Sequence, residues 1–225
     1  ANLLMLYSLF EAGLISAGDK VVVPAVSWST DLAPVFQFGL EPILCDCNLH
    51  DLSVDLESLK SIFEIDKPKV LILVSVLGLV PEMAEITKLC KEHDVILLED
   101  ACESLGSEYK GQKIGSFGLM SSFSTYFGHH ISTIEGGVVC TNDKKMSNIL
   151  KSIRSHGWLR DVDSDYEQEM LDKYKVNEFN HLYTFYHSGF NVRATDLQAY
   201  LGLRQLEKLP DLVKKRKDNY DTYRD

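Results

Sequence analysis

Two adjacent histidines, His129 and His130, are the side chains best suited to chemistry in this sequence. They lie within SSFSTYFGHHISTIEGGVVCT, residues 121–141, which begins as a short strand, turns through a loop and returns into a second apolar run. Small residues in this stretch would let the backbone approach a bound group closely. Histidine can transfer protons near neutral pH. The alternative is a surface hairpin whose histidines are simply solvated.

A second candidate is Asp100, which directly follows the apolar run VILLE, with Glu103 close behind it. Ligands of open α/β sheets bind at the carboxyl ends of parallel strands, which is where we expect Asp100 to lie. A carboxylate there could face a cationic ring nitrogen or a metal ion. The alternative role is an N-cap for the following turn.

A metal site would draw on the same part of the chain, because His129, His130, Glu135, Asp100 and Cys102 are all of ligand type. Adjacent histidines in an extended loop tend to point in opposite directions, however. None of the spacings HxH, HxxxH or CxxC occurs. We therefore expect no metal.

The elements that must position these residues alternate between short apolar strands and helices. We predict strands at residues 21–24, 42–45, 70–76 and 95–98, and helices at 29–38, 55–63, 81–93, 144–156 and 195–208. This alternation predicts an α/β fold with a mainly parallel central sheet flanked by helices. Residues 161–180 read as a mobile excursion or an irregular helix, and Pro210 interrupts the last helical pattern.

Composition narrows the class of protein. The 225 residues carry a net charge of −10 with no basic block, which makes nucleic acid and anionic membranes poor partners. No apolar run approaches the roughly 20 residues that span a bilayer, and there is no signal-peptide pattern. Five cysteines without a CxxC pair suggest reduced thiols and a cytoplasmic protein. Both ends fall within helical patterns, so we expect the middle of a longer protein.

Several motifs, in order along nearly the whole chain, carry a family resemblance. They are GDKVVVPAVSWSTDLAPVFQFGLEPILCD, EDACESLGSEYKGQKIGSFG, SFSTYFGHHISTIEGGVVCTND and FNVRATDLQAYLGLRQLEKL. The chain resembles the DegT-type sugar aminotransferases and dehydratases, which are fold-type I pyridoxal-phosphate enzymes. The resemblance implies that residues 1–225 are the cofactor-binding large domain. The family's N-terminal phosphate-binding turn and C-terminal small domain would lie outside this sequence.

The resemblance also assigns roles to individual residues. Asp100 resembles the carboxylate that pairs with the pyridine nitrogen and keeps the ring an electron sink, and Glu103 takes the place of a Gln beside the ring hydroxyl. Trp28 resembles the aromatic that stacks on the ring, with an ordinary core or surface aromatic as the alternative. Ser124 resembles the hydroxyl that binds the cofactor phosphate. Asn191 resembles an Asn that reaches the phosphate of the neighbouring subunit, which implies a homodimer.

One departure decides the reaction that the resemblance implies. Aligned on Glu135-Gly136-Gly137, His129 stands where aminotransferases carry the lysine that binds the cofactor covalently. Imidazole has no primary amine, but it can still move protons. This change resembles the 3-dehydratase branch, in which the pyridoxamine form condenses with a 4-keto sugar as the 3-hydroxyl leaves. A related branch adds an iron–sulfur cluster; Cys102 could match its first ligand, but no cysteine follows Cys140.

We therefore expect a nucleotide-sugar 3-dehydratase of cell-surface deoxysugar synthesis. It would use pyridoxal 5'-phosphate and pyridoxamine 5'-phosphate, take a nucleotide-linked 4-keto-6-deoxy sugar, and use L-glutamate as amino donor. Two alternatives stay open. One is a nucleotide-sugar aminotransferase, for which Lys110, Lys113 and Lys144 are the nearby substitute lysines. The other is a truncated scaffold without turnover. Ser75, where many members carry a His, is a departure with no predicted effect.

Overall fold

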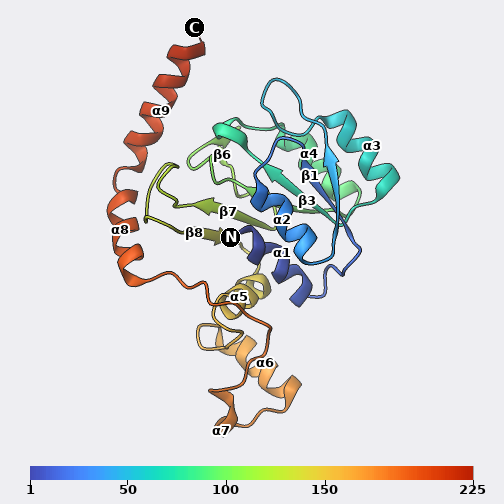
Figure 1. Ribbon diagram of the computed structural model, residues 1–225, viewed down its shortest axis with the longest axis vertical. Coiled ribbons are helices and arrows are strands. Elements are labelled where there is room, and N and C mark those ends of the chain that lie inside the picture. The colour runs from blue at the N-terminus through green and yellow to red at the C-terminus, as the bar shows by residue number, and fades with distance from the viewer. Residues whose placement is uncertain (225) are drawn as a thin grey trace.

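A six-stranded sheet with the strand order β2-β1-β3-β4-β7-β8 forms the centre of the computed structural model, which describes residues 1–224 (Figure 1). In this order the five strands from β2 to β7 all run parallel to one another, and β8 runs antiparallel to β7. The strands are β1 (Lys20–Pro24), β2 (Glu41–Cys45), β3 (Val70–Val74), β4 (Ile96–Asp100), β7 (Met120–Ser124) and β8 (Gly137–Cys140). The predicted mainly parallel α/β sheet is confirmed.

The central strands of this sheet are apolar because both of their faces are covered. β3 has the sequence VLILV, and all five of its residues are buried. Its register against β4 pairs Val70 with Ile96 at one end and Val74 with Asp100 at the other. The carboxyl ends of these two strands therefore reach the same edge of the sheet.

Helices cover the two faces through two separate hydrophobic clusters. α1 (Asn2–Glu11), α2 (Ser29–Gln37) and α5 (Lys144–Ile153) pack on one face, with buried side chains that include Leu6, Val35 and Ile149. α3 (Leu56–Asp66) and α4 (Met83–Glu92) pack on the other, with Phe63 and Ile86 among the buried side chains. A small hairpin, β5 (Glu108–Tyr109) and β6 (Gln112–Lys113), lies outside the main sheet.

Several predicted boundaries differ from those in the structure by a few residues, and two of these differences lie close to the candidate site. β3 ends at Val74 and not at Val76, because the chain turns into the short 3-10 helix η1 (Val76–Gly78), where Leu77 has a left-handed backbone. α4 begins at Met83 and not at Pro81. Both differences fall at the edge of the sheet where the strand ends meet.

Of the two expectations for residues 161–180, a mobile excursion or an irregular helix, the structure supports the helical one. This part of the chain forms α6 (Ser164–Tyr174) and α7 (Glu178–His181). Tyr166 and Met170 of α6 are buried and belong to the same hydrophobic cluster as α1 and α5. Burial of these two residues against the rest of the fold orders a segment whose local sequence is strongly polar.

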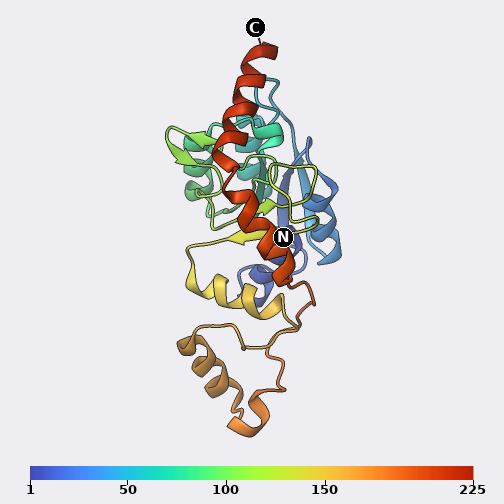
Figure 2. The ribbon, with the colours of Figure 1, turned by 90° about the vertical axis from the view of Figure 1, so that its left-hand side faces the viewer.

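The helical pattern is interrupted next to Pro210, as the sequence predicted, because one helix ends at Leu206 and the next begins at Leu209. Pro210 occupies the first turn of α9 (Leu209–Arg224), where its missing N–H would have no intrahelical partner in any case. α8 (Asp196–Leu206) precedes it, and both helices run along the side of the molecule that carries β8 (Figures 1 and 2). Neither helix buries a residue, and Leu197 and Leu203 are largely exposed. No helix within residues 1–224 is long and apolar enough to cross a membrane.

Candidate cofactor site

Asp100 is the last residue of β4, at the carboxyl edge of the parallel strands where the sequence placed it. Its side chain is buried, with 5% of the residue exposed. Oδ1 accepts a hydrogen bond from the backbone N–H of Cys102 at 2.9 Å, and Oδ2 accepts one from the Asn2 side chain at 2.5 Å. Both donors are neutral, so a buried carboxylate here is well placed to receive a cationic group.

Asn2 joins Asp100 to a second buried carboxyl group, that of Asp31 on α2. Asn2 Nδ2 also donates to Asp31 Oδ1 at 2.8 Å, and the backbone N–H of Trp28 donates to Asp31 Oδ2 at 3.1 Å. Burial, followed by the negative charge of Asp100, raises the pKa of Asp31 to about 8. Neither Asn2 nor Asp31 was among the predicted site residues. Each lies in the first turn of a helix, and nothing in the neighbouring sequence indicates contact with Asp100.

Glu103 lies in the turn that follows Asp100, and its side chain is hydrogen-bonded to the segment that follows β3. Its Oε2 accepts a hydrogen bond from the backbone N–H of Leu77 in η1 at 2.6 Å. The next residue, Ser104, is also bonded to this segment, since its Oγ donates a hydrogen bond to the carbonyl of Ser75 at 2.6 Å. Glu103 therefore braces the loops after β3 and β4 against each other.

A cavity of about 360 Å³ opens beside this cluster, between the first turn of α1, α2 and the ends of β7 and β8. Gly136 and Gly137 form part of its wall, and its polar lining comes from Asn2, Thr30, Gln37, Cys102 and Ser124. Ser124 Oγ accepts a hydrogen bond from the backbone N–H of Tyr126 at 3.1 Å, which leaves its own hydrogen available to a ligand. Burial raises the pKa of Cys102, and the negative charge of Asp100 adds to this, so its thiol stays protonated at neutral pH.

His129 and His130 lie in the loop between β7 and β8, and neither lines this cavity. The carbonyl of His129 accepts a hydrogen bond from Arg216 of α9 at 3.1 Å, and its ring meets Tyr126 edge-on with the centroids 5.6 Å apart. Among the described residues, neither histidine has a hydrogen-bond partner for its buried Nδ1 atom. Burial, then the charge of Arg216 and the neighbouring His129, lower the pKa of His130 to about 4.

Trp28 and Asn191 are also absent from the cavity lining. Trp28 precedes α2 and is 74% exposed, so its ring is free to cover a group beside the cavity. Asn191 is exposed and forms a backbone bridge with Ser155 after α5. Of the six predicted site residues, Ser124 lines this cavity and the others do not. Asp100 is hydrogen-bonded to two of the lining residues, Asn2 and Cys102.

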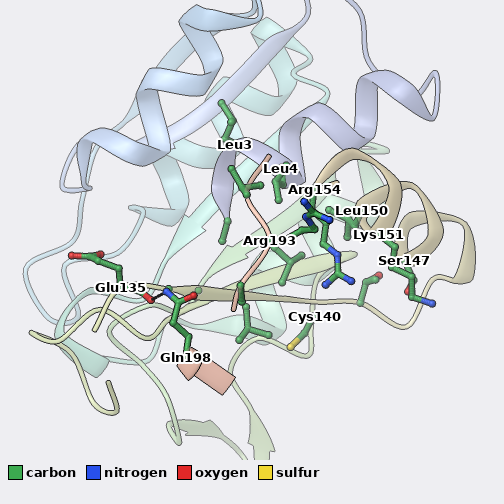
Figure 3. Close-up of a pocket in the computed structure, with 18 residues that line it drawn as sticks. Leu3, Leu4, Glu135, Cys140, Ser147, Leu150, Lys151, Arg154, Arg193 and Gln198 are labelled. Atoms are coloured by element: carbon green, nitrogen blue, oxygen red, sulfur yellow. Dashed lines mark hydrogen bonds between the residues drawn. The ribbon is translucent and has the colours of Figure 1, made fainter. Parts of the chain in front are cut away.

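A larger cavity, of about 820 Å³, lies along β8 on the side of α5 (Figure 3). In this view Glu135 and Gln198 lie at one end, joined by a hydrogen bond of 2.7 Å from Gln198 Nε2 to the carbonyl of Glu135, and Lys151 lies at the other end. Arg154 and Arg193 line it between them. This cavity shares Ala1, Leu3, Gly136 and Gly137 with the smaller one, so the two meet at the start of α1.

The family model for the DegT/DnrJ/EryC1/StrS aminotransferase family matches residues 1–225, and the chain belongs to this family. Its fold, a mostly parallel central sheet flanked by helices, is shared with solved structures of this family. Among curated proteins it is 37% identical to the GDP-4-keto-6-deoxy-D-mannose 3-dehydratase of Yersinia pseudotuberculosis over 227 residues, covering 100% of this chain and 57% of the relative. The enzyme of the same name from Escherichia coli O55:H7 is also 37% identical, with 100% and 58% covered.

Solved structures of a 3-dehydratase and of an aminotransferase also resemble this chain. The structure described as E. coli GDP-4-keto-6-deoxy-D-mannose-3-dehydratase with bound hydrated PLP has a TM-score of 0.87 at 37% identity, covering 98% of this chain and 56% of that chain. PseC of Helicobacter pylori, described as an aminotransferase involved in pseudoaminic acid biosynthesis, has a TM-score of 0.82 at 31% identity, with 98% and 54% covered. The chain thus spans little more than half the length of these relatives.

Three features show that the residues present fit a pyridoxal-phosphate cofactor. Asp100 is a buried carboxylate whose hydrogen-bond donors are neutral, as a protonated ring nitrogen requires. Ser124 carries a hydroxyl hydrogen at the cavity. His129 Nδ1 is a buried ring nitrogen without a partner among the described residues. By contrast, no group of three or more His, Cys, Asp or Glu within the described residues is arranged to hold a metal ion.

Proposed function

We propose that the protein is a nucleotide-sugar 3-dehydratase that acts on a GDP-linked 4-keto-6-deoxy hexose. The observation that carries the proposal is His129, which stands at the lysine position of the family motif, in a chain 37% identical to two GDP-4-keto-6-deoxy-D-mannose 3-dehydratases. When bound, pyridoxamine 5'-phosphate would supply an amine that condenses with the 4-keto group and a ring that accepts electrons.

In this proposal the chain's own residues bind the cofactor and move protons. Asp100 holds the ring nitrogen in its protonated state, and Trp28 covers the face of the ring. Ser124 donates its hydroxyl hydrogen to the phosphate, and Glu103 stands beside the ring hydroxyl. His129 would accept a proton and return it as the 3-hydroxyl leaves, which is chemistry that an imidazole can perform near neutral pH.

The same proposal extends to assembly, location and pathway. Asn191 is exposed and is not among the residues that line the cavity of Ser124, which supports a role at the phosphate of a partner subunit in a homodimer. Five free cysteines support a cytoplasmic protein. L-glutamate would serve as amino donor, as supported by a related dehydratase structure described as holding a PLP-glutamate geminal diamine. A 31% identical relative from Salmonella typhimurium is described as a lipopolysaccharide biosynthesis protein, which supports a role in cell-surface deoxysugar synthesis.

An aminotransferase would need a lysine close to the cofactor, and the positions of the three candidate lysines argue against this. Lys110 and Lys113 lie at the β5–β6 hairpin, where Glu82 and Glu108 respectively form salt bridges with them. Lys144 opens α5. None of the three is among the residues that line the two cavities.

Mass spectrometry of the products tests the proposal. The full-length protein is incubated with pyridoxal 5'-phosphate, L-glutamate and a panel of GDP-, dTDP- and UDP-linked 4-keto-6-deoxy sugars. Loss of the 3-hydroxyl oxygen from the GDP-linked sugar supports the dehydratase. An amino group at C4 with the 3-hydroxyl retained would make the protein an aminotransferase. If the protein binds the cofactor but changes none of the sugars, the non-catalytic scaffold is the remaining interpretation.

A further inference from the structure

Asp31 is a buried carboxyl group that the cofactor-binding motifs do not account for. It lies on the first turn of α2 with no exposed surface, while Asp100, at the end of β4, is 5% exposed. The two groups come from separate elements and face each other across Asn2 Nδ2, which lies 2.8 Å from one carboxyl oxygen and 2.5 Å from the other. A single amide nitrogen thus fixes the position of both.

The surroundings of this pair cannot balance two negative charges. Its hydrogen-bond donors are the Asn2 amide and the backbone N–H groups of Trp28 and Cys102, all neutral. Buried carboxylates that share one site do not both ionise, because each disfavours the charge of the other. Asp31 has the fully buried position and its pKa is raised, so Asp31 holds the proton.

We propose that Asp31 is a positioning residue of the cofactor site: in its neutral form it fixes Asn2 and Asp100, so that Asp100 presents a single negative charge to a bound pyridine ring. This inference rests on the proposed function in its assignment of Asp100 to the ring nitrogen. The backbone N–H of Trp28 donates to Asp31 Oδ2 at 3.1 Å. The side chain of Asp31 therefore contacts both Trp28 and, through Asn2, Asp100.

Other titratable groups that face the pair are few. Cys102 comes from the loop after β4, and burial, to which the negative charge of Asp100 adds, raises the pKa of its thiol, so the thiol stays neutral at neutral pH. Cys102 is present in wild type and in any Asp31 variant, so a comparison between the two isolates Asp31.

The test compares wild type with Asp31→Asn and Asp31→Leu in the full-length protein. Asn keeps a neutral group that can donate to Asp100, and Leu has a similar volume without polar atoms. The first measurement is the unfolding equilibrium of the cofactor-free protein against pH. Unfolded Asp loses its proton near pH ~3.9, and Asp31 in the folded state near pH 8. Between these values the folded wild type binds the extra proton.

We therefore expect the unfolding constant of wild type to rise with pH in this window relative to Asp31→Asn, by up to about tenfold per pH unit. Titration with pyridoxal 5'-phosphate, followed by absorbance, is the second measurement. Asp31→Asn should bind within about threefold of wild type, and Asp31→Leu at least roughly tenfold more weakly, because Asp100 loses its support.

Each result decides something. Equal pH profiles for wild type and Asp31→Asn would overturn the neutral state of Asp31, and equal cofactor affinity of all three proteins would overturn its positioning role. Affinity lost equally in Asp31→Asn and Asp31→Leu would mean that the site needs the charge of Asp31. These results leave the proposed function standing. Failure of wild type itself to bind pyridoxal 5'-phosphate would overturn the proposed function as well. If Asp31→Leu does not fold, the comparison of wild type with Asp31→Asn still decides.

Discussion

Glu99 and Asp100 are consecutive carboxylates on β4 whose side chains point to opposite faces of the sheet. Glu99 accepts hydrogen bonds from three backbone N–H groups of the loop at residues 115–118, with distances of 2.6 to 2.7 Å. Asp100 points toward α1 and α2, where Asn2 donates to it. The alternation of side chains along a strand gives the two residues different tasks. Glu99 stabilises the fold, and Asp100 is available to a ligand.

Glu99→Gln should destabilise the protein without changing cofactor affinity. Three N–H groups converge on the carboxylate, and a Gln side chain turns its own N–H₂ group toward at least one of them. Leaving such a donor unsatisfied costs about 1–3 kcal/mol. Chemical denaturation measures the loss, and titration with pyridoxal 5'-phosphate serves as the control. A variant as stable as wild type would show that the three hydrogen bonds contribute nothing net.

Asp100→Asn should lower activity and leave the stability of the protein nearly unchanged. The amide keeps the size of the side chain but cannot hold a ring nitrogen in its protonated state, so we expect turnover to fall by roughly two orders of magnitude or more. The melting temperature should stay close to that of wild type, in contrast to Glu99→Gln. Steady-state kinetics on the full-length protein checks this. Activity equal to that of wild type would remove Asp100 from the site.

His129→Lys should convert a noncovalent cofactor site into a covalent one. Wild type treated with pyridoxal 5'-phosphate and borohydride should carry no reduced adduct on the peptide of residues 121–141, because imidazole offers no primary amine. The variant should carry one there and should lose dehydration. His130→Lys is the matched control and should give neither the adduct nor the same loss. A borohydride-stable adduct on Lys110 or Lys144 of wild type would favour an aminotransferase.

Arg216→Gln should raise the pKa of His130. Burial is the largest cause of the low value of about 4, and the guanidinium charge of Arg216 is the next. Removing that charge takes away part of the penalty on the protonated ring. Titration of the histidine ring signals by NMR measures the change, with Lys217→Gln as a control of equal charge on the same helix. An unchanged His130 titration would show that α9 does not influence this ring.

Stability should also depend on His130 as the pH falls. Its pKa in the folded protein lies below the value of about 6.5 for an unfolded histidine, so between these values the unfolded state binds the extra proton. The contribution of His130 is present above pH ~6.5 and is lost as the pH falls toward 4. Replacement of His130 by Gln should flatten the decline of the unfolding free energy in this window. The same decline in wild type and variant would contradict the buried neutral state.

Mixing two inactive variants tests whether Asn191 serves the partner subunit. His129→Asn and Asn191→Ala each remove one component of every site in their own homodimers. If the site combines residues from both subunits, a mixed dimer places both defects in one site and leaves the other intact. Random reassociation of equal amounts should then recover about a quarter of wild-type activity. No recovery, with mixed dimers demonstrated by native mass spectrometry, would place Asn191 in its own subunit's site.

The sequence predicted the sheet because its signals are local. Runs such as VLILV are apolar throughout, and the alternation with helices fixes the parallel arrangement. Asp100 was found for the same reason, since its place after a buried strand is readable from its neighbours. The helix α6 was harder to predict, because its local sequence is polar and its buried residues Tyr166 and Met170 belong to a hydrophobic cluster of residues distant in sequence.

The cluster of Asn2, Asp31 and Asp100 escaped sequence analysis for a different reason. Its hydrogen bonds join residues 29 and 98 positions apart, and none of the intervening patterns encodes that distance. Of these three residues the motif resemblance assigned a role to Asp100 only, although Asp31 lies within one of the matching motifs. The positions of Trp28 and Asn191 around the cavity could likewise be seen only in three dimensions.

The reversed direction of β8 has a consequence for how this fold can change its chemistry. β7 leaves the sheet at the carboxyl edge of the parallel strands, and because β8 is antiparallel the chain re-enters at that same edge. Residues 125–136 form a loop whose two ends are fixed by these strands, and His129 lies within it. A replacement at position 129 therefore changes a loop residue and no strand of the sheet. Natural selection can exchange one reactive group for another there while the scaffold that carries it is inherited unchanged.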